Sequence, residues 1–132
     1  MISRRLLIVS MLAACLAAPM AFGQSIASKV DYVGTSRHLK VKGLKVKDAT
    51  LLTLYVEVEN TDYDDQQGYY RLSWMDESGF PAWEEEAWKP ILVHGGQVLK
   101  LQIVAPTAKA RDFKIEFSGD RNWAGPTRPD SN

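Results

Sequence analysis

Side chains that could perform acid–base, nucleophilic or metal chemistry are sparse in this sequence. Its two histidines are His38, which follows Arg37, and His94, which precedes a pair of glycines. A serine hydrolase needs a histidine within reach of a serine and a carboxylate, and neither histidine lies in a Gly-x-Ser-x-Gly context. Histidines so far apart in the chain also match no zinc-binding pattern. We expect both to be exposed turn residues.

Asp62, Asp64 and Asp65 form an acidic cluster of the kind that can bind calcium. The helix-flanked calcium loop would require glycine where Gln67 stands and glutamate where Ser73 stands, and the sequence has neither. Aspartate is also common in turns, because its side chain bonds to nearby backbone N–H groups. The cluster therefore predicts a solvated hairpin loop, with a looser calcium site as the alternative.

Three consecutive glutamates, residues 84–86, lie between Trp83 and Trp88. Paired carboxylates hydrolyse glycosidic bonds when they face each other across a sugar. Consecutive residues point in different directions, so a hydrolase that uses these glutamates with His94 is the least favoured hypothesis. We expect no catalytic residue, no metal site and no cofactor, and therefore a protein that is not an enzyme.

Aromatic side chains are more informative than the titratable ones. Together with Trp74, the sequence carries more large aromatic residues than one small core absorbs. Some are expected to cap the ends of the fold, and others to form an exposed patch that stacks on sugars or binds protein. The candidate binding residues are Tyr69, Trp83, Trp88 and Trp123.

The strands that would position these side chains follow from an alternation of apolar and polar residues. In residues 52–58 the apolar side chains stand at the even positions, which is typical of an antiparallel strand with one buried face. The pattern recurs in residues 70–74, 99–103 and 113–117, in a short first stretch at 30–32, and a polar loop is expected over 60–68. Six to seven short strands separated by turns predict an all-β fold, a single immunoglobulin-like antiparallel β-sandwich.

Residues 39–47 contain a change of phase. The apolar positions are odd before Gly43 and even after it, which predicts a β-bulge at the glycine. The opposite face consists of Lys40, Lys42, Lys45 and Lys47. These lysines indicate an edge strand protected from aggregation by charge, with a face for anionic glycan, phosphate or lipid head groups as the alternative.

The N-terminal residues 1–23 read as a signal peptide. Arg4 and Arg5 precede an apolar stretch that ends in small residues and is broken by Pro19. Cleavage before Gln24 would release a soluble periplasmic domain. Cleavage before Cys15, which follows a lipoprotein-like box, would instead give a protein lipidated at that cysteine and anchored to the outer membrane.

Composition limits the remaining possibilities. The chain has 132 residues with 16 basic, 16 acidic and one cysteine residue, which suits one domain and excludes a disulfide framework. The balance of charge gives no support to nucleic-acid binding. We expect a β-sandwich domain over residues 24–122 and a disordered tail over 123–132.

A family resemblance rests on structural marks between residues 70 and 117. They are an aromatic strand, an Asp-x-x-Gly turn, an apolar middle segment, an Ala-Pro strand end and a closing strand, namely Arg71–Asp76, Asp76–Gly79, Ile91–Val93, Ala105-Pro106 and Phe113–Phe117. With these marks, residues 50–118 resemble the YcfL-like family of small bacterial envelope proteins, many of them predicted lipoproteins. The resemblance implies an immunoglobulin-like sandwich in the periplasm without an established activity, so it transfers no catalytic residues.

The expected function is that of a non-enzymatic periplasmic interaction module, lipid-anchored or soluble, whose partner is an unknown envelope protein. The contact would be carried by the sandwich edges or by the aromatic region from Tyr69 to Trp88. The alternative is a module that binds peptidoglycan or another glycan through exposed tryptophans. Contact with a membrane is expected only through a lipid anchor at Cys15.

Overall fold

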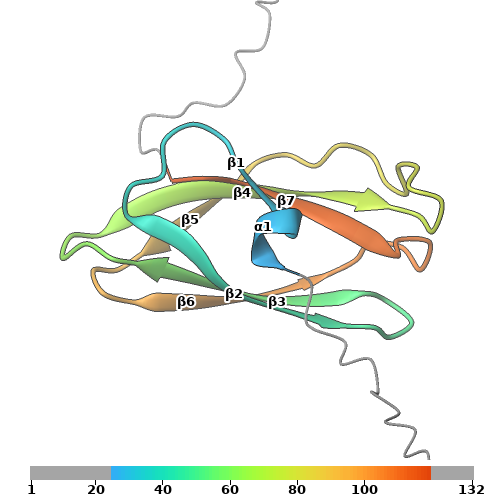
Figure 1. The fold of residues 1–132 in the computed structure, drawn as a ribbon, viewed down its shortest axis with the longest axis horizontal. Coiled ribbons are helices and arrows are strands. Elements are labelled where there is room, and N and C mark those ends of the chain that lie inside the picture. The colour runs from blue at the N-terminus through green and yellow to red at the C-terminus, as the bar shows by residue number, and fades with distance from the viewer. Residues whose placement is uncertain (1–24, 120–132) are drawn as a thin grey trace, which may run out of the picture.

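The structure, a computed structural model, describes residues 25–119. Within these residues one short helix and seven strands form two layers, which lie one above the other in Figure 1. The elements in chain order are α1 (Ile26–Lys29), β1 (Val30–Tyr32), β2 (Leu39–Lys47), β3 (Thr53–Asn60), β4 (Gln66–Met75), β5 (Lys89–Val93), β6 (Val98–Val104) and β7 (Asp112–Ser118).

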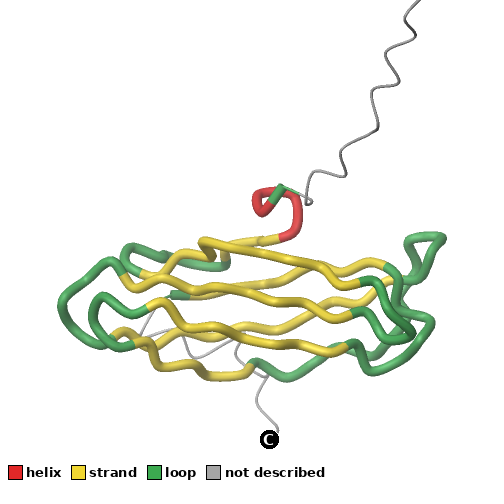
Figure 2. The backbone as a smooth tube through the Cα atoms, turned by 90° about the horizontal axis from the view of Figure 1, so that it is seen from below, coloured by secondary structure: helices red, strands yellow, loops and turns green. Residues whose placement is uncertain are grey.

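The strands pair into a four-stranded sheet, in the order β1-β7-β4-β5, and a three-stranded sheet, in the order β2-β3-β6. β1 runs parallel to β7, and the other pairings are antiparallel. The strands run along the length of the molecule, the loops gather at its two ends, and α1 stands at one long side (Figure 2). The predicted all-β sandwich is confirmed.

The core lies between the inner faces of the two sheets. Alternate residues of each strand point inward, as the period-2 pattern predicts, and side chains such as Leu54, Val58, Leu72, Phe113 and Phe117 are fully buried. Burial of an aliphatic or aromatic side chain of this size contributes about 1.5–3 kcal/mol to stability. The packing of the two sheets against each other is therefore a large contribution to stability.

The predicted bulge in β2 is confirmed. Val41 pairs with Val58, but Gly43 pairs with Glu57, so that Lys42 is the extra residue. A Cβ atom at Gly43 would lie 2.8 Å from the Oε2 atom of Glu57, which shows that the glutamate side chain covers the glycine. The bulge restores the inward direction of the apolar residues after the phase change, and it does so on an edge strand, as expected.

The expected loop over residues 60–68 is wrong in extent. β3 continues through Asn60 and β4 begins at Gln66, so only five residues connect them. Asn60 is buried, because its side chain satisfies its hydrogen bonds inside the fold: Nδ2 donates to the carbonyl oxygens of Asp64 and Val93, and Oδ1 accepts from the N–H of Asp62. A polar residue thereby ends the strand without leaving it exposed.

The expectations for the two termini lie outside the described residues. These are the signal peptide over 1–23, cleavage before Cys15 or Gln24, the binding role of Trp123, and the tail over 123–132. In the described part, no helix has the length and apolar character to cross a membrane.

Candidate interaction surface

Arg71 organises the outer face of the four-stranded sheet. Its Nε atom donates to Glu116 on β7, its Nη1 atom donates to Glu85, and its guanidinium carbon lies 4.6 Å from the centre of the Trp88 ring. The hydrogen bond to Glu116 raises the pKa of Arg71, and the nearby Glu85 charge adds to this effect. A guanidinium over an indole face is a favourable cation–π contact. Arg71 thus fastens the segment around Trp88 to the sheet.

Glu86 binds to β4 beyond the last residue that pairs with β5, Tyr70. Its Oε2 atom accepts a hydrogen bond from the N–H of Leu72, and its Oε1 atom accepts one from Nε1 of Trp74, both at 3.2 Å. A carboxylate that accepts from a buried indole and an unpaired strand N–H satisfies groups that would otherwise be costly to bury. Glu85 and Glu86 therefore hold the fold together, and neither faces His94 in a catalytic pair.

The predicted aromatic binding residues are not one exposed patch. Tyr69 is half-buried on β4 beside Pro90, and its hydroxyl accepts a hydrogen bond from Gln67. Trp88 is half-buried beneath Arg71. Trp83 is 44% exposed. A binding role for these residues stays a prediction. Of the three predicted residues that the structure describes, only Trp83 is exposed.

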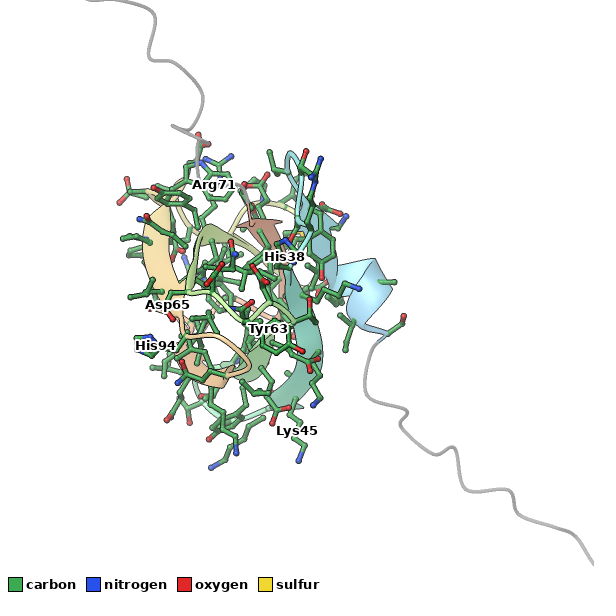
Figure 3. The ribbon with its side chains drawn as sticks, turned by 90° about the vertical axis from the view of Figure 1, so that its left-hand side faces the viewer. His38, Lys45, Tyr63, Asp65, Arg71 and His94 are labelled. Carbon is green, nitrogen blue, oxygen red and sulfur yellow. The ribbon has the colours of Figure 1, made fainter. Side chains whose placement is uncertain are left out.

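The acidic cluster lies at one end of the sandwich, where Figure 3 shows Tyr63, Asp65 and His94 facing the viewer. Asp62 accepts from the Tyr63 N–H and from Gln66, while Asp65 accepts from the Gly95 N–H and lies 3.1 Å from Nδ1 of His94. The contact with His94 lowers the pKa of Asp65, and the Gly95 N–H adds to this. Asp62 and Asp65 connect the loop after β3 to the loop after β5. Within residues 25–119, no three or more histidine, cysteine, aspartate or glutamate side chains are grouped so that they could hold a metal ion.

The outer face of the three-stranded sheet carries the lysines. Figure 3 places Lys45 on the side of the sandwich opposite Arg71. A hollow of about 630 Å³ is not confined to this face, because core-facing side chains also line it. Its lining includes the core-facing Ile26, Leu44, Val56 and Leu101 as well as Lys45, Tyr55, Glu57 and Lys100. No ion pair joins the lysines of this face to a carboxylate of the described residues: Lys40, Lys42, Lys45, Lys47 and Lys100.

The two sheets have four edges, and three of them are obstructed. β1 is only three residues long and follows directly on α1. β5 carries Pro90, which has no N–H to donate. On β2 the N–H of Val41 donates to the Tyr32 hydroxyl at 3.0 Å, the Ser36 hydroxyl donates to the Leu39 carbonyl, and the bulge follows. None of these edges offers a regular ladder to an incoming strand.

β6 is the fourth edge, and it is regular. The N–H of Asn60 donates to Gln97 and the N–H of Ala105 donates to Leu52, so the odd residues of β6 make the hydrogen bonds to β3. The even residues direct their backbone groups away from the sheet, and no hydrogen bond from a described residue reaches them: Val98, Lys100, Gln102 and Val104. β6 has no proline and no bulge, and Lys100 is its single charge.

Sequence patterns did not predict the contacts of Arg71, Glu86 and Glu116. Arg71 and Glu116 are 45 residues apart, and Leu72 and Glu86 are 14 apart, so their contacts depend on strand order. The charge of Arg71 within an alternating strand was the only available signal. The lysines of β2, by contrast, correctly predicted an edge.

The described part of the chain is thus a seven-stranded β-sandwich. Its distinctive surface features are the regular edge strand β6, the lysines on the outer face of the three-stranded sheet, and the contacts of Arg71 on the outer face of the other sheet. The chain belongs to the family described as "Protein of unknown function (DUF1425)", whose model matches residues 26–118. The family and the structure together indicate no specific activity.

Solved structures share this fold. The crystal structure of Campylobacter jejuni Cj0090 is 21% identical, with a TM-score of 0.62 over 70% of this chain and 98% of that one. The crystal structure of a DUF1425 family member from Shewanella sp. pv-4 is 22% identical, with a TM-score of 0.54 over 60% of this chain and 75% of that one. A search of the curated proteins gives no match.

Proposed function

We propose that the protein is a non-enzymatic interaction module of the bacterial envelope that binds an extended strand of a partner along β6. The observation that carries this proposal is the unequal protection of the sheet edges. Three edges are obstructed by shortness, proline, a bulge or hydroxyl groups, whereas β6 presents a regular unpaired ladder. Proteins commonly protect their edge strands, because an open edge is a template for pairing with another chain.

Strand addition would give the partner both affinity and direction. The backbone groups of Val98, Lys100, Gln102 and Val104 are available, and each hydrogen bond made in place of water contributes about 0.5–1.5 kcal/mol. The side chains of Leu99 and Leu101 are half-buried at the same edge, so a strand laid beside β6 also covers apolar surface.

A place in the periplasm is supported by the sequence of the first 23 residues, which has the order of a secretory signal, and by the resemblance to the YcfL-like family. Anchoring through Cys15 or release before Gln24 are the two forms that processing would give. The intact mass of the protein from membrane and periplasmic fractions distinguishes them.

The test of the proposed function is photo-crosslinking in cells, with p-benzoylphenylalanine placed at Gln102. Lys45 is a matched control position. Lys45 on β2 and Gln102 on β6 both pair with Tyr55 of β3, one at each edge of the sheet, and both are exposed. We expect a discrete crosslinked protein at Gln102 and none at Lys45. The absence of a crosslinked species at Gln102, or equal capture at both positions, contradicts the proposal.

Glycan binding is the second candidate function, and the exposed ring of Trp83 is the observation that favours it. One indole can stack on a sugar ring, while Trp88 is engaged by Arg71 and serves as a control. Binding to purified sacculi that is lost in Trp83→Ala supports this candidate. Binding unchanged in Trp83→Ala, or none in the unaltered protein, excludes it.

A further inference from the structure

We infer that the strand which β6 binds is β6 of a second copy of this chain, arranged antiparallel about a two-fold axis at Leu101. The inference rests on the proposed function, because it names the partner of the same edge. In a two-fold dimer both copies use the same patch, so the patch must be complementary to itself. The sequence and the register of β6 meet this requirement.

β6 reads the same in both directions when its residues are grouped by chemistry. Its sequence is Val-Leu-Lys-Leu-Gln-Ile-Val, with Leu101 at the centre. Antiparallel pairing about Leu101 places each residue opposite one of its own class in the second copy: Val98 on Val104, Leu99 on Ile103 and Lys100 on Gln102. The pairing brings no like charges together, and like charges directly opposite each other are destabilising.

The backbone agrees with this register. The residues whose N–H and C=O groups point away from β3 stand at even positions, and reflection about Leu101 places even positions opposite even positions. Both strands therefore present donors and acceptors at the same pairs, each of which exchanges two hydrogen bonds. Leu101 faces Leu101 of the second copy in the close pair between them.

The neighbouring symmetric registers are poorer. An axis at Lys100 would set two lysines directly opposite each other, with their Cα atoms about 5.5 Å apart. An axis at Gln102 would leave Val98 beyond the end of the overlap and would place Lys100 on Val104. The register centred on Leu101 alone uses the whole length of the strand and satisfies both faces.

The inward side chains of β6 also favour pairing with a second copy. Leu99 and Leu101 point inward but remain half-buried, unlike the inward residues of β3, which are fully buried. In the dimer these side chains pack against Ile103 and Leu101 of the second copy, and apolar area is removed from water at about 25 cal/mol per Å². The two three-stranded sheets become one sheet in the order β2-β3-β6-β6-β3-β2.

Sedimentation velocity on the full chain measures the association. We expect a dimer for the unaltered protein and for Gln102→Ala, and a monomer for Gln102→Pro. Proline at this position removes only an N–H that points away from β3, so the monomer stays folded. A monomer for the unaltered protein at all concentrations, or a dimer that Gln102→Pro leaves intact, overturns the inference.

Disulfide formation tests the register without depending on the proline variant. In a Cys15→Ser background, Leu101→Cys is expected to oxidise to a covalent dimer, because the Cα atoms of such a pair lie about 4.5 Å apart. Leu99→Cys alone is the matched control and is expected to stay monomeric. Mixed with Ile103→Cys, it is expected to give a covalent heterodimer. Crosslinking of Leu99→Cys to itself, or none in Leu101→Cys, contradicts the register.

The photo-crosslinking at Gln102 separates this inference from the proposed function. A crosslinked species that contains only this chain supports both. A species that contains a different protein, from a chain that sediments as a monomer, overturns the second-copy inference and leaves the proposed function standing. A monomer with no crosslinked species overturns both.

Discussion

The two edges of the three-stranded sheet, β2 and β6, differ both in their own residues and in what the rest of the molecule places against them. β2 has four exposed lysines, a bulge, and backbone groups that bond to Tyr32 and Ser36. β6 has one lysine, unbroken register and no such bonds in the described part. Both edges flank the same strand, so the difference comes from the residues of β2 and from the contacts of Tyr32 and Ser36, and not from β3. It shows that edge protection is assigned strand by strand.

The largest expected effect comes from the same substitution placed on each edge. Val41→Pro removes the N–H that bonds to Tyr32 and replaces a buried side chain, so the free energy of unfolding should fall by about 2–4 kcal/mol. At protein concentrations low enough for the unaltered chain to be monomeric, Gln102→Pro on β6 should cost less than about 1 kcal/mol. Urea unfolding of both variants checks this. Equal losses would mean that the two edges do not differ.

Tyr32→Phe tests the hydroxyl that covers β2. The N–H of Val41 loses its acceptor, and the expected loss of stability is about 1 kcal/mol. Tyr55→Phe is the control, because this exposed tyrosine lies on β3, next to β2, and its hydroxyl makes no hydrogen bond with a described residue. Its stability should change by less than about 0.5 kcal/mol. Thermal or urea unfolding of the pair gives the difference, and a similar loss in both would rule out the protection of β2 by Tyr32.

Gly43→Ala tests whether the bulge requires glycine at this position. The new Cβ atom meets the carboxylate end of Glu57, a flexible group that can turn away, and the backbone at Gly43 needs no left-handed conformation. We expect a loss below about 1 kcal/mol and an unchanged register by backbone NMR. A larger loss, or a shifted register, would show that the bulge depends on the glycine.

The smallest effect is expected from pH at the β1 edge. Burial raises the pKa of Asp112, but the Lys29 ammonium and the Phe113 N–H outweigh it, so the pKa of this carboxyl lies below its usual range. A lowered folded-state pKa adds stability above the unfolded value of about 3.9, and this stability is lost as the pH falls through the folded value. Unfolding measured from neutral to acid pH should show Asp112→Asn losing less stability than the unaltered protein. Parallel curves would contradict the pKa direction.

Much of the fold could be predicted from local patterns, and the interaction surface could not. The alternation at Leu54, Val56 and Val58 predicted a buried strand face, and the phase change at Gly43 predicted the bulge. These features depend on neighbours in the chain. Whether β6 lies in the middle or at the edge of a sheet depends on strand order, which alternation does not contain. The roles of Arg71 and Glu86 required the same long-range knowledge.

The position of α1 determines how the molecule is oriented if its N-terminal end is held. α1, which stands at one long side of the molecule (Figure 2), contacts β1, β2 and β7. The described part of the chain therefore begins beside β2, and β6 is the opposite edge of the same sheet. A tether attached upstream of Ile26 would then hold the domain by its protected side. β6, together with a second copy bound to it, would lie on the side of the domain away from the point of attachment.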